Sequence, residues 1–269
     1  MSEQILDVKD LSVSFRMYDR GLTQYELNVI NGLSVSVNEG EIMVIVGASG
    51  SGKSVLAHAV LGILPPNAII NGEMTYCGRE LTDSIRKEKV GNEIIMIPQA
   101  VTYLDPLMKV GKQVRGIKGT KEQQEAAFER YGLKSSVANM YPFQLSGGMT
   151  RRVLISTAVI SDAKLILADE PTPGLSEDIA EETMRNFREL ADGGRGILMI
   201  THDIDIALRV ADKIAVFYDG KTVDTCDKEA FLQGGDAIKH PYTRALWAAL
   251  PQNGFKAVSP EDFMKEVSQ

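Results

Sequence analysis

The stretch EIMVIVGASGSGKS occupies residues 41–54 and carries the strongest structural signal in the chain. It begins with an apolar run, residues 42–46, that has no polar alternation, which is typical of a strand buried on both faces of a parallel sheet. Three glycines follow at residues 47, 50 and 52, and a helical pattern starts at Lys53. The sequence therefore predicts a buried strand, a glycine-rich turn and a helix in direct succession.

The glycine-rich turn has the spacing of a phosphate-binding loop, because residues 47–54 fit the pattern GxxxxGK[ST] between a strand and a helix. Glycines allow backbone N–H groups to turn inward around phosphate oxygens, and the helix N-terminus adds partial positive charge. We expect Lys53 to reach the β- and γ-phosphates and Ser54 to offer its hydroxyl to Mg²⁺. The predicted nucleotide-binding residues of the loop are Gly47, Ala48, Ser49, Gly50, Ser51, Gly52, Lys53 and Ser54.

A second apolar run ends in two carboxylates. LILA at residues 165–168 is followed directly by Asp169 and Glu170. We expect Asp169 to hold Mg²⁺, directly or through water, and Glu170 to polarise an attacking water. The loop and the acid pair together define P-loop NTPases in general, a class that includes GTPases, small-molecule kinases, helicases and transporter motors.

Further apolar runs and helical patterns alternate along the chain. Residues 196–200 and 213–218 are continuous apolar runs, whereas residues 5–15 and 33–37 alternate apolar and polar positions, as half-buried antiparallel strands do. Residues 179–190 place apolar side chains on one helical face. This succession predicts an α/β fold: a P-loop NTPase (RecA-like) core with a mainly parallel sheet and an N-terminal antiparallel β lobe.

Residues from about 101 to 160 contain helical patterns and no convincing strand. Thr120 is the expected N-cap of one helix, and residues 152–160 have a second helical pattern. We therefore predict an inserted helical lobe at about 101–160. The expected ATPase domain covers 1–252, with the β lobe and core at 1–100 and 161–240, and a C-terminal tail follows at 253–269.

Composition and charge limit the classes of partner. A net charge of −7 and a pI near 5.2 give no general attraction to nucleic acid, and we expect no nucleic-acid partner. The apolar runs are about five residues long, whereas a membrane-spanning helix needs about 20. The first ten residues lack the features of a secretory signal, so we expect residence in the cytosol.

The charge run at residues 86–89 is expected to be a solvated loop.

A third motif lies about 20 residues upstream of Asp169, where LSGGM occupies residues 145–149 just before a helical pattern. We expect the N–H groups of Ser146, Gly147 and Gly148 to bind a phosphate from a second direction. Without its context, the same motif is also compatible with a plain loop that leads into a helix cap.

Together, the phosphate-binding loop, LSGGM and the acid pair resemble the motifs of the ABC ATPase family, and the resemblance covers nearly the entire chain. It implies that Gln99 is the Q-loop glutamine, which senses Mg²⁺ and links the site to the helical lobe. It also implies that His202 is the switch histidine that contacts the γ-phosphate. Phe15, with Tyr18 as the substitute, is the implied ring that stacks on adenine, although Phe15 is equally placed to close the core of the β lobe.

The resemblance also implies a mechanism. Two such domains meet head to tail, and each ATP lies between the phosphate-binding loop of one domain and LSGG of the other. Hydrolysis of ATP, with Mg²⁺ bound, lets the domains separate and moves a membrane partner. The groove beside the Q-loop, residues 102–107, is the implied contact with that partner.

Two further segments resemble the peptide and nickel importer branch of the family: HPYTRAL at 240–246, and a D-P-x-x-x-V-G-x-Q pattern that begins at Asp105. The implied partners are two integral membrane permease subunits, a second similar ATPase subunit in a homo- or heterodimer, and indirectly an extracytoplasmic solute-binding protein. The implied location is peripheral, at the cytoplasmic face of the cell membrane. The cargo stays open between peptides and nickel or another metal chelate.

Two positions depart from the family pattern. Ser176 stands where the D-loop usually has an aspartate, and Arg151 stands where a glutamine is more usual after the signature. A serine cannot offer a carboxylate across a dimer interface, so we expect an asymmetric pair with a partner ATPase.

Other functions fit the sequence less well. Soluble ABC proteins of DNA repair or translation carry two cassettes or a long coiled-coil insertion, and 269 residues hold neither. A small-molecule kinase needs neither LSGG nor His202, and a GTPase needs an NKxD motif that is absent from the sequence. A regulatory or non-transport ATPase with little or no hydrolysis by the isolated chain is the remaining alternative, and Glu170 together with His202 argues against it.

Overall fold

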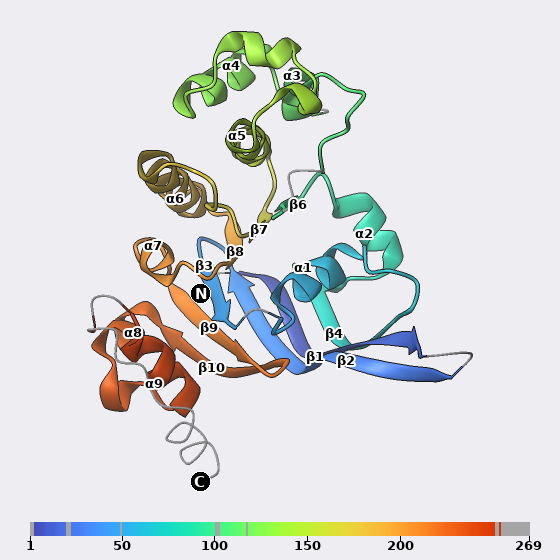
Figure 1. Cartoon of the computed structure of the whole chain (residues 1–269), viewed down its shortest axis with the longest axis vertical. Coiled ribbons are helices and arrows are strands. Elements are labelled where there is room, and N and C mark those ends of the chain that lie inside the picture. Colours follow the sequence, from blue (N-terminus) through green and yellow to red (C-terminus); the bar gives the residue numbers. More distant parts are fainter. Residues whose placement is uncertain are drawn as a thin grey trace.

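The chain folds into a sheet-based core from which a group of helices projects (Figure 1). The computed structural model describes residues 3–19, 23–48, 50–99, 103–116, 118–250 and 253. Ser49, Thr102 and all of the expected C-terminal tail except Asn253 lie outside the described residues.

Two sheets form the framework. A four-stranded antiparallel sheet has the order β2-β1-β4-β5, and a six-stranded sheet has the order β10-β9-β3-β8-β7-β6. In the larger sheet every neighbouring pair is parallel except β10 with β9. The strands are β1 (Gln4–Tyr18), β2 (Gln24–Asn38), β3 (Ile42–Gly47), β4 (Ala68–Tyr76), β5 (Arg79–Glu80), β6 (Ile94–Ile97), β7 (Leu165–Asp169), β8 (Gly196–Ile200), β9 (Lys213–Tyr218) and β10 (Lys221–Asp227).

The continuous apolar runs of the core become strands because both faces of the larger sheet are covered. Met43 and Ile45 of β3 pack with α1 (Lys53–Leu61) and the antiparallel sheet. Val44 and Val46 point to the opposite face, into a second cluster that includes Phe187. That second cluster also receives side chains from α5 (Gly147–Val159), α6 (Glu177–Asp192), α7 (Ile204–Leu208), α8 (Lys228–Gln233) and, partly buried, α9 (Pro241–Ala248).

Besides the two-residue strand β5, two longer strands, β4 and β10, were not anticipated from the sequence. Both are mostly half-buried or exposed along their length, and β10 is polar and lies at an edge of its sheet. A strand that is not buried on both faces needs no continuous apolar run, so its sequence carries only a weak signal. Their pairing with β1 and β9 therefore comes from tertiary structure.

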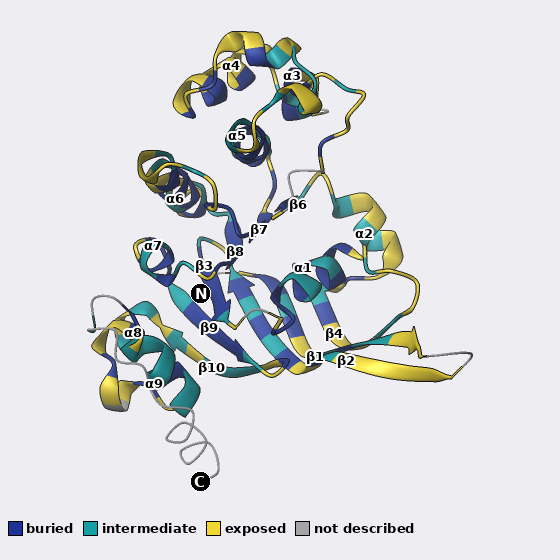
Figure 2. Ribbon diagram, in the orientation of Figure 1, coloured by how far each residue is buried: buried dark blue, intermediate teal, exposed yellow. Residues whose placement is uncertain are grey.

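The helical lobe has a hydrophobic core of its own, which includes Val110, Phe128, Val137 and Val153. Its helices are α3 (Val110–Arg115), α4 (Lys121–Arg130) and α5, with short 3₁₀ segments η2 (Ser135–Asn139) and η3 (Pro142–Gln144). Helices α3 and α4 stand apart from the sheets with exposed outer surfaces, whereas α5 also packs against the larger sheet (Figures 1 and 2).

Helix starts in the lobe follow their caps. Thr120 caps α4 as expected, in a capping box with Gln123. The helix expected from residue 152 begins five residues earlier, at Gly147, because the Ser146 side chain accepts a hydrogen bond from the Met149 N–H at 3.3 Å. The two glycines of the signature, residues 145–149, thus form the first turn of α5.

The charge run at residues 86–89 is not a solvated loop. It forms the last turns of α2 (Asp83–Lys89), whose N-cap is Thr82. Arg86 is partly buried, and its Nε donates to the carbonyl of Val60 at the end of α1 at 3.1 Å. The loop expectation failed because Thr82 caps a helix through these residues, although Lys87 and Glu88 are exposed as a solvated segment would be.

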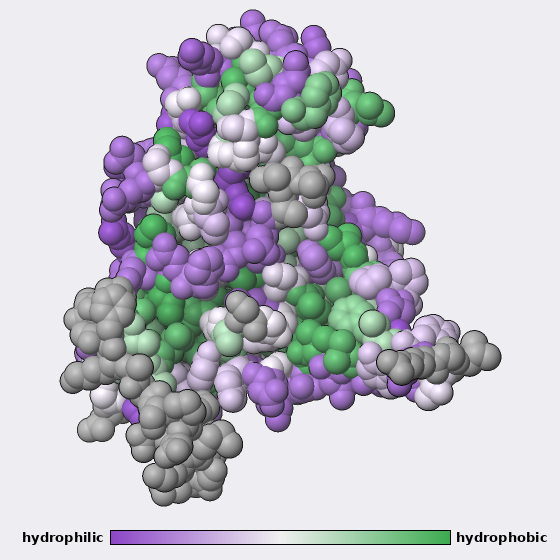
Figure 3. Space-filling model, in the orientation of Figure 1, coloured by the Kyte–Doolittle hydropathy of each residue, from purple (hydrophilic) through white to green (hydrophobic). Residues whose placement is uncertain are grey.

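Surface polarity varies between parts of the molecule. On the face shown in Figure 3, hydrophobic residues gather around α1 and over the larger sheet, whereas hydrophilic residues prevail on α2 and α6. Within the described part of the chain, no helix has both the length and the apolar character that crossing a membrane requires.

Truncation of the core at Phe187 should destabilise the fold. Phe187 on α6 is 1% exposed, and its removal leaves a cavity under the sheet. We expect Phe187→Ala to lower the free energy of unfolding by about 3–5 kcal/mol, measured by urea denaturation. Leu232→Ala on α8 is the control, because Leu232 is 49% exposed and should change stability by less than about 1 kcal/mol. Equal effects of the two changes would contradict this packing.

Candidate nucleotide-binding site

The phosphate-binding loop joins β3 to α1 and depends on glycine at two positions. Gly47 has φ 153°, and a Cβ built there would lie 2.2 Å from the carbonyl oxygen of Phe217 on the neighbouring strand. Gly52, the N-cap of α1, has φ 91°, and a Cβ there would lie 2.8 Å from Ile30. Both positions combine a backbone conformation that favours glycine with a close approach of neighbouring atoms.

Lys53 folds back over the loop. Its Nζ donates to the carbonyl oxygens of Gly47 at 2.9 Å and Ala48 at 2.8 Å. Burial lowers the pKa of Lys53, while the charges of Glu170 and Asp169 act in the opposite direction. The ammonium group is therefore held at the mouth of the loop, between the loop carbonyls and two carboxylates.

A cavity of about 320 Å³ lies beside the loop and collects residues from five separate segments. The sheet explains their meeting, because β3, β8 and β7 are adjacent parallel strands whose carboxyl ends share one edge. The lining residues are Val29, Gly50, Gly52, Lys53, Ser54, Val55, Gln99, Asp169, Glu170 and Ile200.

Asp169 has the environment of a cation ligand. It is 3% exposed, and its Oδ1 has no hydrogen-bond partner among the residues that the structure describes. Burial raises the pKa of Asp169, and a hydrogen bond with the Ser54 side chain opposes that rise. A buried carboxylate oxygen without a donor is unfavourable unless a cation approaches it, so Asp169 and Ser54 fit an Mg²⁺ ion at this position.

Glu170 and His202 meet at the strand ends. The Glu170 carboxylate lies 2.9 Å from Nδ1 of His202, whose side chain is 69% exposed. The hydroxyl of Thr201 donates to the other carboxylate oxygen of Glu170 at 3.4 Å. The backbone of Glu170 has φ 49°, an unusual conformation for a residue with a side chain. The structure thus brings together a buried acid and an exposed histidine that are 32 residues apart in sequence.

The signature residues lie elsewhere. Ser146 and Gly147 are exposed at the start of α5, and neither they nor Gly148 lines the cavity that contains Lys53. Their N–H groups are therefore accessible to a ligand from outside this chain. Ser176, the D-loop departure, is also exposed and is the N-cap residue of α6 without a side-chain capping bond.

The predicted adenine-stacking rings lie on β1. Phe15 is half-buried against the core cluster of the β lobe, and Tyr18 is 64% exposed and accepts a hydrogen bond from Gln24. Neither ring lines the cavity beside the loop. The assignment of adenine to either ring therefore stays a prediction, and Ser49 of the loop lies outside the described residues.

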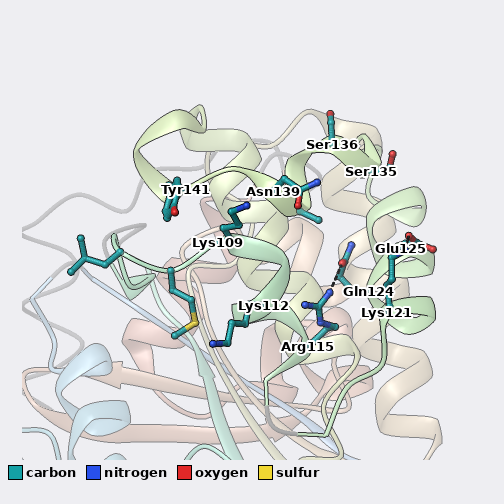
Figure 4. Close-up of a pocket in the computed structure, with 13 residues that line it drawn as sticks. Lys109, Lys112, Arg115, Lys121, Gln124, Glu125, Ser135, Ser136, Asn139 and Tyr141 are labelled. Carbon is teal, nitrogen blue, oxygen red and sulfur yellow. Dashed lines mark hydrogen bonds and ion pairs between the residues drawn. The ribbon is translucent and has the colours of Figure 1, made fainter.

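A larger cavity, of about 650 Å³, lies in the helical lobe and contains none of the predicted site residues. Lys109, Lys112 and Arg115 line one side of it, and Arg115 points toward Gln124 on α4 (Figure 4). The smaller cavity is therefore the candidate nucleotide site, since Lys53 of the loop and the strand-end pair Asp169 and Glu170 line only that one among the described cavities.

Comparison with known sequences agrees with this geometry. The sequence model of the family described as ABC transporter matches residues 30–173, which is more than half of the chain. The chain belongs to the ABC transporter family. It is accordingly an ATP-binding protein of the ATPase type, and ATP hydrolysis coupled to transport is the general reaction of the family.

Several curated relatives align over nearly the whole of this ABC ATPase. It is 35% identical over 266 residues to the oligopeptide transport ATP-binding protein OppD of Bacillus subtilis (strain 168), covering 92% of this chain and 72% of the relative. It is 36% identical over 265 residues to the dipeptide transport ATP-binding protein DppD of Escherichia coli (strain K12), covering 92% and 79%. The similarity therefore extends well beyond the common motifs, into the peptide importer branch.

Solved structures share the fold. A dimeric structure of the ATP-binding cassette MJ0796 in a post-hydrolysis state, bound to ADP and Pi, has a TM-score of 0.73 at 24% identity, covering 83% of this chain and 99% of that one. A structure described as the ATP binding subunit of an ABC transporter has a TM-score of 0.70 at 21% identity and covers 98% of this chain and all of that one. The α/β fold with an antiparallel β lobe and a helical lobe is thereby confirmed.

The sequence interpretation of this ABC ATPase missed three contacts at the site. Thr201 donates to Glu170, Arg151 reaches the carbonyl of Glu170, and the hydroxyl of Tyr242 accepts a hydrogen bond from the Ala48 N–H at 3.1 Å. Tyr242 belongs to HPYTRAL, which served above only as a marker of the branch. Its ring centroid lies 4.4 Å from that of Tyr218 at the end of β9, so α9 contacts both β9 and the phosphate-binding loop. No spacing rule links residues 194 positions apart, so only the folded chain reveals this contact.

Removal of the Tyr242 hydroxyl should weaken nucleotide binding. The N–H of Ala48 in the loop then loses its acceptor, the hydroxyl of Tyr242. A hydrogen bond of this kind contributes about 0.5–1.5 kcal/mol. We expect Tyr242→Phe to raise the Kd for ATP by about 2- to 10-fold, measured by titration with a fluorescent ATP analogue. Tyr141→Phe in the helical lobe, remote from the loop, should leave the Kd unchanged. An unaltered Kd in Tyr242→Phe would show that the contact does not support the loop.

Proposed function

We propose that this chain is the ATP-binding and ATP-hydrolysing subunit that powers an ABC importer for peptides. The observation that carries the proposal is the single cavity that gathers Lys53, Asp169 and Glu170. A phosphate-binding lysine, a carboxylate suited to a cation and a second carboxylate suited to water are the groups that nucleotide hydrolysis requires. Whole-chain similarity to oligopeptide and dipeptide transport proteins supports peptides as the cargo.

The residues of the cavity divide the chemistry among them. The N–H groups of the loop and Lys53 bind the phosphates, and Ser54, Asp169 and Gln99 would hold Mg²⁺. When bound, Mg²⁺ neutralises charge on the phosphate oxygens. Glu170 orients and polarises the attacking water, and His202 contacts the γ-phosphate beside it. Catalysis then depends on positioning and electrostatics, as in phosphoryl transfer generally.

The exposed signature supports a sandwich of two ATPases. Ser146 and Gly147 are exposed, Gly148 is partly exposed, and none of the three lines the cavity of its own chain, so we infer that they bind the ATP of another subunit. We infer a closed pair in which each ATP lies between one phosphate-binding loop and the other signature. Ser176 in place of the usual aspartate favours a pair made with a second, different ATPase.

The proposed assembly is peripheral to a membrane. Two permease subunits would carry the peptide across the bilayer, and the ATPase pair would bind them from the cytoplasmic face. A solute-binding protein on the other side of the membrane would deliver the cargo. We propose one ATPase domain at 1–252, with the helical lobe at 101–160 as its membrane-facing part.

Peptide uptake tests the cargo. We expect cells in which this chain carries Glu170→Gln to lose uptake of a labelled dipeptide or tripeptide and to retain uptake of labelled nickel. Cells with the unchanged chain are the control for both substrates. Loss of nickel uptake alone would mean that the cargo is a metal chelate and not a peptide. Retention of both uptake activities would contradict a role of this chain in either import.

Trapping of the closed pair tests the mechanism. Glu170→Gln removes the carboxylate that activates water while the phosphate-binding loop stays intact, so ATP–Mg²⁺ should hold the sandwich closed. We expect this variant to sediment as a dimer only with ATP–Mg²⁺, either alone or with the second ATPase. Lys53→Ala in addition to Glu170→Gln is the control, because the loss of phosphate binding should abolish association.

The two modes of association separate the alternatives. Dimers of the chain alone would support a homodimeric motor and contradict the asymmetric pair. Association only with the second ATPase would support the asymmetric pair. If nucleotide induces neither, the sandwich mechanism is wrong for this protein.

A further inference from the structure

Arg151 connects the helical lobe to the two loops that follow β6 and β7, which carry Gln99 and Glu170 and are called the catalytic loops below. It lies on α5 one turn after the start of the helix and is 6% exposed. Its Nη1 donates to the carbonyl oxygen of Glu170 at 2.7 Å and to that of Pro98 at 3.1 Å, and its Nη2 donates to the carbonyl oxygen of Gln99 at 2.7 Å. Pro98 and Gln99 follow β6, and Glu170 follows β7, the parallel neighbour of β6. A single guanidinium, carried by α5 of the helical lobe, therefore links the ends of two neighbouring strands of the core.

The charge of Arg151 makes this bridge hard to break. Burial lowers the pKa of Arg151, whereas the charges of Glu170 and Asp169 oppose that shift, and an arginine stays protonated in proteins. A buried cation is costly unless it is hydrogen-bonded. The three carbonyls bond both terminal nitrogens, whereas Nε has no partner among the described residues, so the cation depends on the loops after β6 and β7 for its hydrogen bonds.

The Glu170 backbone needs such support. Its φ of 49° is unfavourable for a residue with a Cβ and persists only where the surroundings hold it. Its N–H donates to the carbonyl of Ile200 at 2.9 Å, and its carbonyl accepts from Arg151. A change at either bond would rotate the peptide and re-aim the carboxylate that lies beside His202.

We propose that Arg151 is a positioning residue for ATP hydrolysis. It holds the backbones of Glu170 and Gln99 in one arrangement and ties that arrangement to α5, whose first turn is the signature. Displacement of α5 when the signature meets the nucleotide of another subunit is thereby transmitted to both loops of its own site. The inference deepens the proposed function and rests on the roles proposed there for Glu170 and Gln99.

Arg152 is a matched control supplied by the chain itself. It is the next residue on α5, and it also donates to three backbone carbonyls, those of Tyr131 at 3.0 Å, Gly132 at 3.2 Å and Gly148 at 3.2 Å. All three acceptors lie in the helical lobe. Loss of Arg152 therefore removes comparable bonds without touching either catalytic loop.

Steady-state ATP hydrolysis by Arg151→Met and Arg152→Met tests the proposal. The full chain is assayed, together with the second ATPase and permeases wherever the unchanged chain needs them. We expect Arg151→Met to lower kcat by about 10- to 100-fold, because a misplaced catalytic group loses rate, and to change the KM for ATP by less than about threefold. Arg152→Met should keep kcat within about threefold of the unchanged protein.

Several outcomes would overturn the proposal. One is an unchanged kcat in Arg151→Met, another is an equal loss of kcat in Arg151→Met and Arg152→Met, and a third is a rise in KM that matches the loss in kcat. If Arg151→Met does not unfold cooperatively, Arg151→Lys decides. An ammonium keeps the charge but cannot span carbonyls on two loops, so kcat should still fall with KM unchanged, and a normal kcat would reject the role of the guanidinium.

Glu170→Gln in the same assay separates this inference from the proposed function. If that variant hydrolyses ATP normally, the proposed role of Glu170 is wrong. If Glu170→Gln is inactive while Arg151→Met keeps its kcat, only the role of Arg151 is wrong.

Discussion

Parallel pairing of β3, β8 and β7 is the constraint on which the site depends. Ile200 of β8 is in register with Ile45 of β3 on one side and with Asp169 of β7 on the other. β7 and β8 therefore end at the same level, β3 continues two residues beyond it to Gly47, and the segments that follow the three strands meet at this edge. Lys53, His202 and Glu170 are brought to one edge by the backbone pairing of these strands, which Glu170 extends through its own N–H bond to Ile200.

The buried charges at this edge depend on one another. Lys53, Arg151, Asp169 and Glu170 are each less than a tenth exposed, and isolated charges of this kind are unfavourable in a protein interior. The two cations are satisfied largely by carbonyls of the surrounding loops, while the two acids lie between them. The Oδ1 atom of Asp169 has no hydrogen-bond partner among the described residues, and this is where we propose that Mg²⁺ binds.

Much of this arrangement was predictable, because its signals are local. The glycine-rich loop, the acid pair and the apolar runs specify backbone conformation and burial over a few residues, and they led to the correct core strands. Edge strand β10, the helical character of residues 86–89 and the early start of α5 were missed, since each depends on a neighbour or a cap that periodicity does not report. The stacking of adenine on Phe15 stays a prediction because its ring lies against the β lobe.

The sequence by itself determined which chemical groups are available: a phosphate-binding loop, two acids at a strand end, and a signature that leads into a helix. Only the tertiary structure decided which of them share a cavity and what holds them. Arg151 reaches Pro98 and Glu170, 53 and 19 residues away, and Tyr242 reaches Ala48 from the other end of the chain. Such contacts follow from the packing of helices on a twisted sheet, where distances in space bear no fixed relation to distances along the chain.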